Sequence, residues 1–148
     1  MKSVIITGCS KGIGLDTALA FGRAGYKVFA TMRNPAMAEA FKQAIKDEGL
    51  NISVSAMDVD SDESVKSCID AILQQFSSID VLVNNAGITR DQLMLRMKED
   101  DWDAVIDTNL KGAWNFSKAA LRPSQPLVVT DTSGGSLHLS VPHAAIVS

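Results

Sequence analysis

Cysteine, aromatic residues, net charge and long apolar runs are all scarce in this 148-residue sequence, and each shortage excludes a class of protein. Two cysteines are too few for a disulfide framework, and with the two histidines they offer no spacing typical of metal ligands. A net charge of −3 leaves no basic excess for nucleic acid. No apolar run approaches the roughly 20 residues that cross a bilayer. We therefore expect no metal site, no nucleic-acid partner and no membrane span.

Two further shortages concern the N-terminus and the tyrosines. Met1, Lys2 and Ser3 lead directly into an apolar run, which leaves no room for a signal peptide. A cytoplasmic location is the expectation, and both cysteines should then be reduced thiols. Tyr26 is the only tyrosine in the chain, which limits the acid–base chemistry that the chain can perform.

Apolar runs typical of strands alternate with helical apolar periods along most of the chain. Strands are expected at residues 4–6, 27–32, 52–56, 81–83 and 127–130. The first helix should end at Gly25, the second should run from an Asn34 cap to Gly49, and the fourth should span residues 101–121. A capping box of Asp60 and Glu63 should start the third. The alternation predicts an α/β fold with a Rossmann-type, doubly wound parallel sheet.

A glycine-rich loop follows the first predicted strand and opens directly into a helix. It comprises Thr7, Gly8, Cys9, Ser10, Lys11, Gly12, Ile13 and Gly14. Gly8 should allow a tight turn, Gly12 should let the backbone approach a pyrophosphate, and Gly14 should let the helix pack closely on the strand. The N–H groups at the start of the helix would then face the phosphates. We predict that these residues, Cys9 excepted, form a dinucleotide-binding loop.

Charge at the end of the second strand indicates which dinucleotide would bind. NAD-binding loops place an acidic residue there, where it accepts hydrogen bonds from the ribose 2′-OH. Here the strand ends at Arg33 instead, and Lys11 lies inside the glycine loop. Two cations favour a 2′-phosphate, so NADP(H) is the predicted cofactor. The alternative is that either cation alone is a solvated surface charge.

Four features taken in order carry a family resemblance. They are the Thr-Gly-x-x-x-Gly-Ile-Gly pattern at residues 7–14, Asp58 after the third strand, the Asn-Asn-Ala-Gly run at residues 84–87, and Asn109 in the fourth helix. Together they resemble the classical short-chain dehydrogenases/reductases. Residues 87–123 look especially similar to the 3-oxoacyl-[acyl-carrier-protein] reductases of that family, and the similarity as a whole covers residues 3–123.

The resemblance implies a role for each matching position. Asp58 and Val59 would border the adenine, and Asn85, Ala86 and Gly87 would lie beside the cofactor. Asn109 would hold a water molecule in a proton relay, and the substrate would be a small carbonyl compound or acyl thioester. Without the resemblance, Asp58 is a turn residue at a strand end. Asn109 is then a structural bridge to a neighbouring backbone, because it is a polar residue within an apolar helical stripe, expected to be buried, that includes Trp102, Leu110 and Trp114.

The sequence departs from the family at its catalytic residues. The family uses a tyrosine as proton donor, a lysine four residues later that lowers the pKa of that tyrosine, and a serine that polarises the carbonyl. Ser133 is the best match for the serine, but the expected tyrosine position falls near Ile146 and Lys118 is the last lysine. His143 lies nearby, and a solvated histidine is its favoured interpretation.

Three interpretations follow from this departure. The chain is a reductase by ancestry that needs groups from elsewhere, a nucleotide-binding pseudoenzyme, or a fragment without function. Residues 1–123 would form a Rossmann half, and residues 124–148 a divergent tail of a truncated or frame-shifted reductase. A sheet incomplete in its C-terminal half would also leave apolar surface exposed, which predicts self-association.

Overall fold

The computed structural model describes residues 1–76, 78–90, 94–121 and 128–131, and its centre is a five-stranded parallel sheet. The strands are β1 (Ser3–Ile6), β2 (Lys27–Met32), β3 (Ile52–Ala56), β4 (Val81–Asn84) and β5 (Val128–Asp131), in the spatial order β3-β2-β1-β4-β5. Every adjacent pair is parallel. The strand order reverses at β1, as in a doubly wound sheet, so the predicted fold class is confirmed for the described residues.

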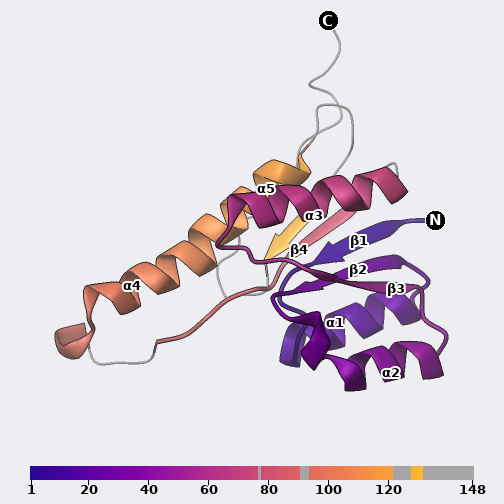
Figure 1. The fold of residues 1–148 in the computed structure, drawn as a ribbon, viewed down its shortest axis with the longest axis horizontal. Coiled ribbons are helices and arrows are strands. Elements are labelled where there is room, and N and C mark those ends of the chain that lie inside the picture. Colours follow the sequence, from indigo (N-terminus) through magenta and orange to yellow (C-terminus); the bar gives the residue numbers. More distant parts are fainter. Residues whose placement is uncertain (77, 91–93, 122–127, 132–148) are drawn as a thin grey trace, which may run out of the picture.

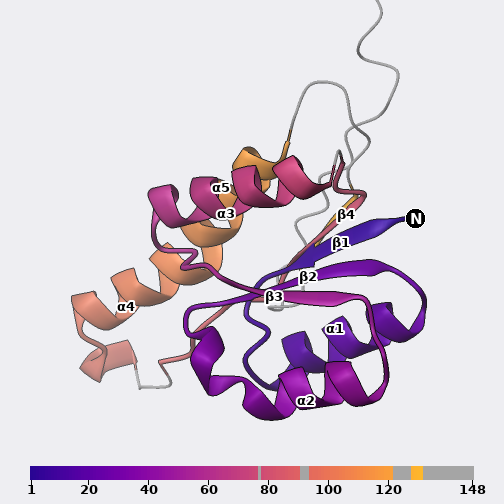
Figure 2. The same ribbon diagram turned by 45° about the vertical axis from the view of Figure 1, so that its right-hand side comes forward.

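Helices cover both faces of the sheet (Figures 1 and 2). On one face lie α1 (Gly12–Arg23) and α2 (Glu39–Asp47), and on the other lie α3 (Asp62–Gln75) and α5 (Gly112–Ala120). Side chains alternate along each strand, so β1 sends Val4 and Ile6 into the core beneath α1 and α2 and Ile5 into the core beneath α3 and α5. Two apolar cores therefore hold the strand ends in fixed positions.

The predicted strands at 27–32 and 52–56 agree with the structure, but two predicted helix starts are wrong. Ser61, rather than Asp60, caps α3, because its hydroxyl accepts a hydrogen bond from the Ser64 N–H. Asn34 does cap a turn through the N–H of Ala36, but that turn is the 3₁₀ segment η1 (Pro35–Met37), and α2 begins only at Glu39. Short polar side chains compete for such caps, and the sequence alone did not show which would succeed.

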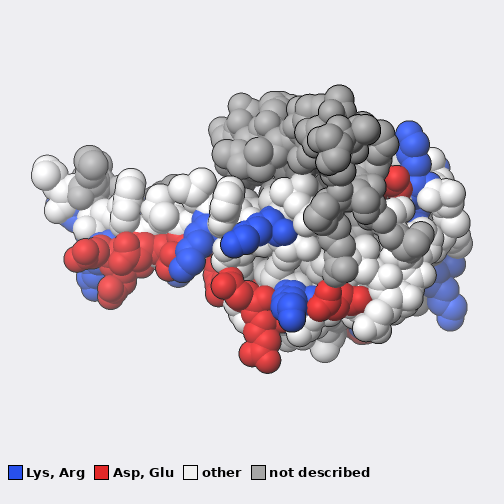
Figure 3. Space-filling view, turned by 90° about the horizontal axis from the view of Figure 1, so that it is seen from above, with Lys and Arg blue, Asp and Glu red and all other residues white. Residues whose placement is uncertain are grey.

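The predicted helix over residues 101–121 consists of three consecutive segments. The helix α4 (Glu99–Ile106) continues through a π-helical stretch, η3 (Asp107–Lys111), into α5, after a short 3₁₀ segment η2 (Met94–Arg96). In Figure 1, α4 projects from the body of the molecule, and Figure 3 shows acidic side chains gathered on this projection. The prediction that the apolar stripe of this helix is buried is wrong for its large residues. Trp102, Leu110 and Trp114 are 53%, 57% and 56% exposed.

Some of the residues named from the sequence lie outside the described ranges, and the structure does not test every expectation. Ser133, His143 and Ile146 lie outside the described residues, and the proposed division at residue 123 stays a prediction. No helix within the described ranges is both long and apolar enough to cross a membrane. The described residues also contain no group of three potential metal ligands.

Candidate functional site

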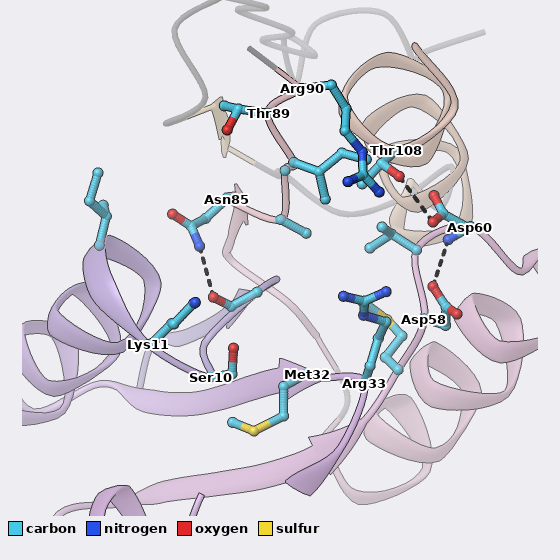
Figure 4. A pocket seen from close by; sticks show the side chains of 17 residues that line it. Ser10, Lys11, Met32, Arg33, Asp58, Asp60, Asn85, Thr89, Arg90 and Thr108 are labelled. Atoms are coloured by element: carbon cyan, nitrogen blue, oxygen red, sulfur yellow. Dashed lines mark hydrogen bonds between the residues drawn. The ribbon is translucent and has the colours of Figure 1, made fainter. Parts of the chain in front are cut away.

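A cavity of about 540 Å³ opens above the carboxyl ends of β1, β2, β3 and β4 (Figure 4). Its lining comes from the loops that follow these four strands and from η3. In a doubly wound sheet, the loops that leave β1 and β4 diverge to opposite faces, which opens a crevice at that point. The cavity therefore lies where the strand order itself places a binding site.

Two glycines allow the first loop to pack against the loop after β4. Gly8 has a φ of +72°, and a Cβ there would lie 2.7 Å from the Cα of Ala86. A Cβ on Gly14 would collide with the Nδ2 of Asn85 and lie 2.5 Å from the Gly8 carbonyl oxygen. Any side chain at these two positions would push the loops apart. Gly8 thus makes the expected tight turn, while Gly14 packs against the neighbouring loop as much as against its own strand.

Hydrogen bonds hold the same two loops together. The Thr7 hydroxyl accepts from the backbone N–H groups of Asn85 and Ala86, each at 2.9 Å. The Asn85 amide donates to the carbonyl oxygens of Thr7 and Gly8 at 2.9 and 3.0 Å. These bonds give Thr7 and Asn85 a structural role at the rim of the cavity, and Asn85, Ala86 and Gly87 also line it.

The start of α1 has the free donors that an anion needs. Lys11 is the N-cap residue and its side chain makes no capping hydrogen bond. The first N–H groups of the helix are therefore available to a ligand, with the positive end of the helix dipole behind them. A Cβ on Gly12, whose φ is +61°, would meet nothing within 4 Å, and its neighbours Lys11 and Ile13 line the cavity. This open, positively polarised backbone suits a pyrophosphate.

Lys11 and Arg33 both line the cavity, on the side of β1 and β2 (Figure 4). Among the described residues, neither side chain has a hydrogen-bond partner or a carboxylate within 4 Å, and the Ser10 hydroxyl lies beside Lys11. Two cations without a protein counter-ion, next to a hydroxyl, form a suitable environment for a phosphate monoester. The residues present therefore fit a phosphorylated dinucleotide.

Asp58 and Val59 line the cavity after β3, which pairs with β2, and Figure 4 shows Asp58 beside Arg33. The Asp58 carboxylate accepts from the Asp60 N–H at 3.1 Å, and the Asp58 N–H donates to the Ser64 hydroxyl at 2.9 Å. Asp58 therefore makes the strand-end turn that its residue type favours, and this turn also brings it to the cavity. Val59 is buried and presents apolar surface there.

Asn109 lies in η3 and binds the backbone of the loop after β4. Its amide accepts from the Ile88 N–H at 2.8 Å and donates to the Ile88 carbonyl oxygen at 3.0 Å. The polar residue in the apolar stripe is thus a bridge to a neighbouring backbone, which was one of its two interpretations. Its side chain lies outside the cavity lining, and its role in a proton relay stays a prediction.

The cysteine in the glycine loop is not a reactive group. Cys9 is fully buried and its thiol donates to the Ile6 carbonyl oxygen at 3.3 Å. Burial raises its pKa to about 12, because the thiolate would lose its hydration. The thiol therefore stays protonated at neutral pH, and it contributes packing beneath the loop rather than chemistry.

Sequence reasoning missed part of the lining. Met32, Met57, Ile88, Thr89, Arg90 and Thr108 also face the cavity. Ile88 and Thr89 follow the Asn-Asn-Ala-Gly run directly, so their position after a parallel strand was an available signal. Thr108 is next to Asn109, and its hydroxyl donates to Asp60 at 3.0 Å. Only the fold shows that this part of η3 faces the turn after β3.

Comparison with known proteins identifies the family. The sequence family described as short chain dehydrogenase matches residues 2–137. The chain belongs to this family. The 3-oxoacyl-[acyl-carrier-protein] reductase FabG of Staphylococcus aureus is 44% identical over 141 residues, and its namesake from Pseudomonas aeruginosa is 42% identical over 121 residues. These alignments cover 94% and 82% of this chain but only 55% and 49% of the two relatives.

Solved structures of the short-chain dehydrogenases agree with this assignment. One of them is an alcohol dehydrogenase from the archaeon Thermococcus sibiricus, complexed with 5-hydroxy-NADP. It is 31% identical to this chain, with a TM-score of 0.78, and the match covers 88% of this chain and 57% of the dehydrogenase. The protein gox2181 is 29% identical with a TM-score of 0.82, and 52% of its chain is covered. The chain thus spans about half the length of the relatives it matches. A nicotinamide dinucleotide is the cofactor class that this family implies.

Proposed function

We propose that these 148 residues form the NADP(H)-binding half of a carbonyl reductase. The observation that carries the proposal is the pair of cations Lys11 and Arg33, which have no counter-ion in the described part of the chain, beside a glycine loop whose following helix has no side-chain N-cap. An acidic residue in place of Arg33 would repel a 2′-phosphate, whereas a guanidinium can bind it through two hydrogen bonds. The start of α1 would hold the pyrophosphate, and Asp58 and Val59 would border the adenine.

Titration with NADPH and NADH tests the cofactor. Wild-type protein should bind NADPH more tightly than NADH, and Arg33→Ala should weaken NADPH binding about 10–100-fold, since a charge-assisted contact is worth roughly 1.5–3 kcal/mol. NADH binding should fall by a smaller factor, because NADH lacks the 2′-phosphate. Arg96→Ala removes an exposed guanidinium outside the cavity lining and serves as the control. An equal loss for NADPH and NADH in Arg33→Ala would contradict the assignment of NADP(H).

The substrate class follows from the relatives and stays part of the proposal. The FabG relatives are named for the reduction of 3-oxoacyl groups, so a 3-oxoacyl thioester is the favoured substrate. The bound nicotinamide would supply a hydride to the carbonyl carbon, and a proton donor must serve the carbonyl oxygen. Tyr26 cannot serve, because it precedes β2, whereas the cavity lies beyond the other end of that six-residue strand, roughly 20 Å away.

We therefore propose that the 148-residue chain binds NADPH without reducing a carbonyl unless another chain or segment supplies the proton donor. Oxidation of NADPH in the presence of a 3-oxoacyl thioester should stay at the background rate. Turnover that is lost in Ser133→Ala would contradict this proposal. It would also show that Ser133 acts in a site that these residues complete. The cytoplasmic location expected from the sequence stays a prediction.

The exposed apolar residues of the α4 to α5 segment favour self-association as a further proposal. Trp102, Leu110 and Trp114 are each more than half exposed along one continuous helical segment. Large apolar side chains gathered in this way mark a contact surface. Sedimentation at increasing protein concentration should show association that Trp114→Gln weakens. Concentration-independent monomers in wild-type protein would contradict it.

A further inference from the structure

Arg90 reaches the cavity from the side opposite to Arg33. Figure 4 shows the two guanidinium groups extending toward the same space, Arg33 from the end of β2 and Arg90 from the loop after β4. The Arg90 side chain is 54% exposed. Its nearest counter-ion among the described residues is Asp101, whose Oδ1 lies 3.7 Å from the Arg90 Nε, too far for a hydrogen bond. Within the described ranges, a loose ion pair is therefore all that holds Arg90 at the cavity.

The main cavity continues into a second cavity at the position of the two arginines. A second cavity of about 320 Å³ adjoins the first and extends toward the α4 to α5 segment. Six residues line both cavities: Arg33, Val59, Asp60, Ile88, Arg90 and Thr108. The two arginines therefore stand at the junction, where Val59 also contributes to the lining of both cavities. A flat aromatic group at this junction would have a guanidinium on each side (Figure 4).

Guanidinium groups are suited to this arrangement. Arginine is planar, weakly hydrated for a cation, and stacks on aromatic faces, whereas lysine carries a compact and strongly hydrated charge. A purine ring has such a face. The contact needs no hydrogen bond to Arg90, so it is compatible with a side chain that is half exposed and loosely paired with Asp101.

We propose that Arg90 positions the adenine of the bound dinucleotide by covering the ring face opposite to Arg33. This inference rests on the proposed dinucleotide site, and it assigns a role to a residue to which the sequence analysis gave none. Arg33 contacts the ribose phosphate end and confers the preference for NADP(H). Arg90 contacts a group that NADPH and NADH share, so it contributes affinity without selectivity.

Binding of NADPH, NADH and ADP to wild-type protein, Arg90→Ala and Arg90→Lys tests this assignment by calorimetry. Arg90→Ala should lose about 3–30-fold in affinity for all three ligands, in equal proportion, since a cation on an aromatic face contributes that much. Arg90→Lys should recover only part of the loss, because the lysine side chain lacks the planar group. Arg96→Ala, on η2, should bind all three ligands as wild-type protein does. Circular dichroism checks that each variant is folded.

The outcomes separate this inference from the proposed function. Wild-type protein that binds neither NADPH nor ADP overturns both. Unchanged affinities in Arg90→Ala overturn only the role of Arg90. A loss confined to NADPH also overturns it, because Arg90 would then be a second ligand of the 2′-phosphate. Full recovery in Arg90→Lys would show that the charge alone matters and would overturn the stacking geometry.

Discussion

Replacing Gly14 by alanine should separate the two loops at the rim of the cavity. The new Cβ would collide with the Asn85 Nδ2 and lie 2.5 Å from the Gly8 carbonyl oxygen, which belongs to the backbone. Gly112 provides a matched control, because it also lies in a helix and is buried. A Cβ there meets the Val59 side chain at 3.2 Å, so relief requires a shift of only a few tenths of an ångström in a side chain rather than in backbone.

The magnitude follows from the groups that must move. Asn85 can withdraw only by giving up its hydrogen bonds to Thr7 and Gly8, at a cost of about 1 kcal/mol each. Relieving the contact with the Gly8 carbonyl requires a shift of backbone, and overpacking of this kind costs about 1–3 kcal/mol. Alanine regains up to about 1 kcal/mol of helix propensity at either position. The net expectation is a loss of about 2–4 kcal/mol for Gly14→Ala and about zero for Gly112→Ala.

Urea denaturation followed by circular dichroism measures both variants. Gly14→Ala should have the lower midpoint, and its thermal transition should fall by about 8–16 °C, at about 4 °C per kcal/mol. In an Asn85→Ala background, part of the obstruction is already gone, so Gly14→Ala should cost less there. Equal stability of Gly14→Ala and Gly112→Ala would refute the close packing of the two loops.

Two other perturbations probe the loop itself. Gly12→Ala and Gly49→Ala place a methyl group at nearly the same positive φ, +61° and +62°, in open space, so each should lose about 1 kcal/mol of stability. Only Gly12→Ala should also weaken NADPH binding, by about tenfold or more, and equal affinities in the two variants would show that the phosphates do not approach Gly12. Burial raises the pKa of Cys9 from 9.0 to about 12, so the unfolded chain loses this proton first and stability should fall as the pH rises above 9. Cys9→Ala should flatten that fall in urea midpoints measured from pH 8 to 10.5, and an unchanged pH dependence would contradict the assignment to Cys9.

The sequence by itself determined the order of the elements and the place of the glycine-rich loop between β1 and α1. Strands at residues 27–32 and 52–56 were predictable because short apolar runs between turn residues depend on local properties. The positions of Gly8 and Gly14 were predictable for a similar reason, since a loop that turns from strand to helix over a few residues needs glycine. Lys11 and Arg33 were found because charge beside that loop is visible in the sequence.

Tertiary structure alone decided the rest, because it depends on contacts between distant segments. The sequence could not choose between a relay and a bridge for Asn109, whereas its bonds to Ile88 show the bridge across 21 residues. It placed Trp102 and Trp114 in a buried stripe, but helical periodicity does not reveal what lies beside a helix. The junction at which Arg90 meets Arg33 arises only when β4 pairs with β1, because strand pairing brings their loops to one edge of the sheet.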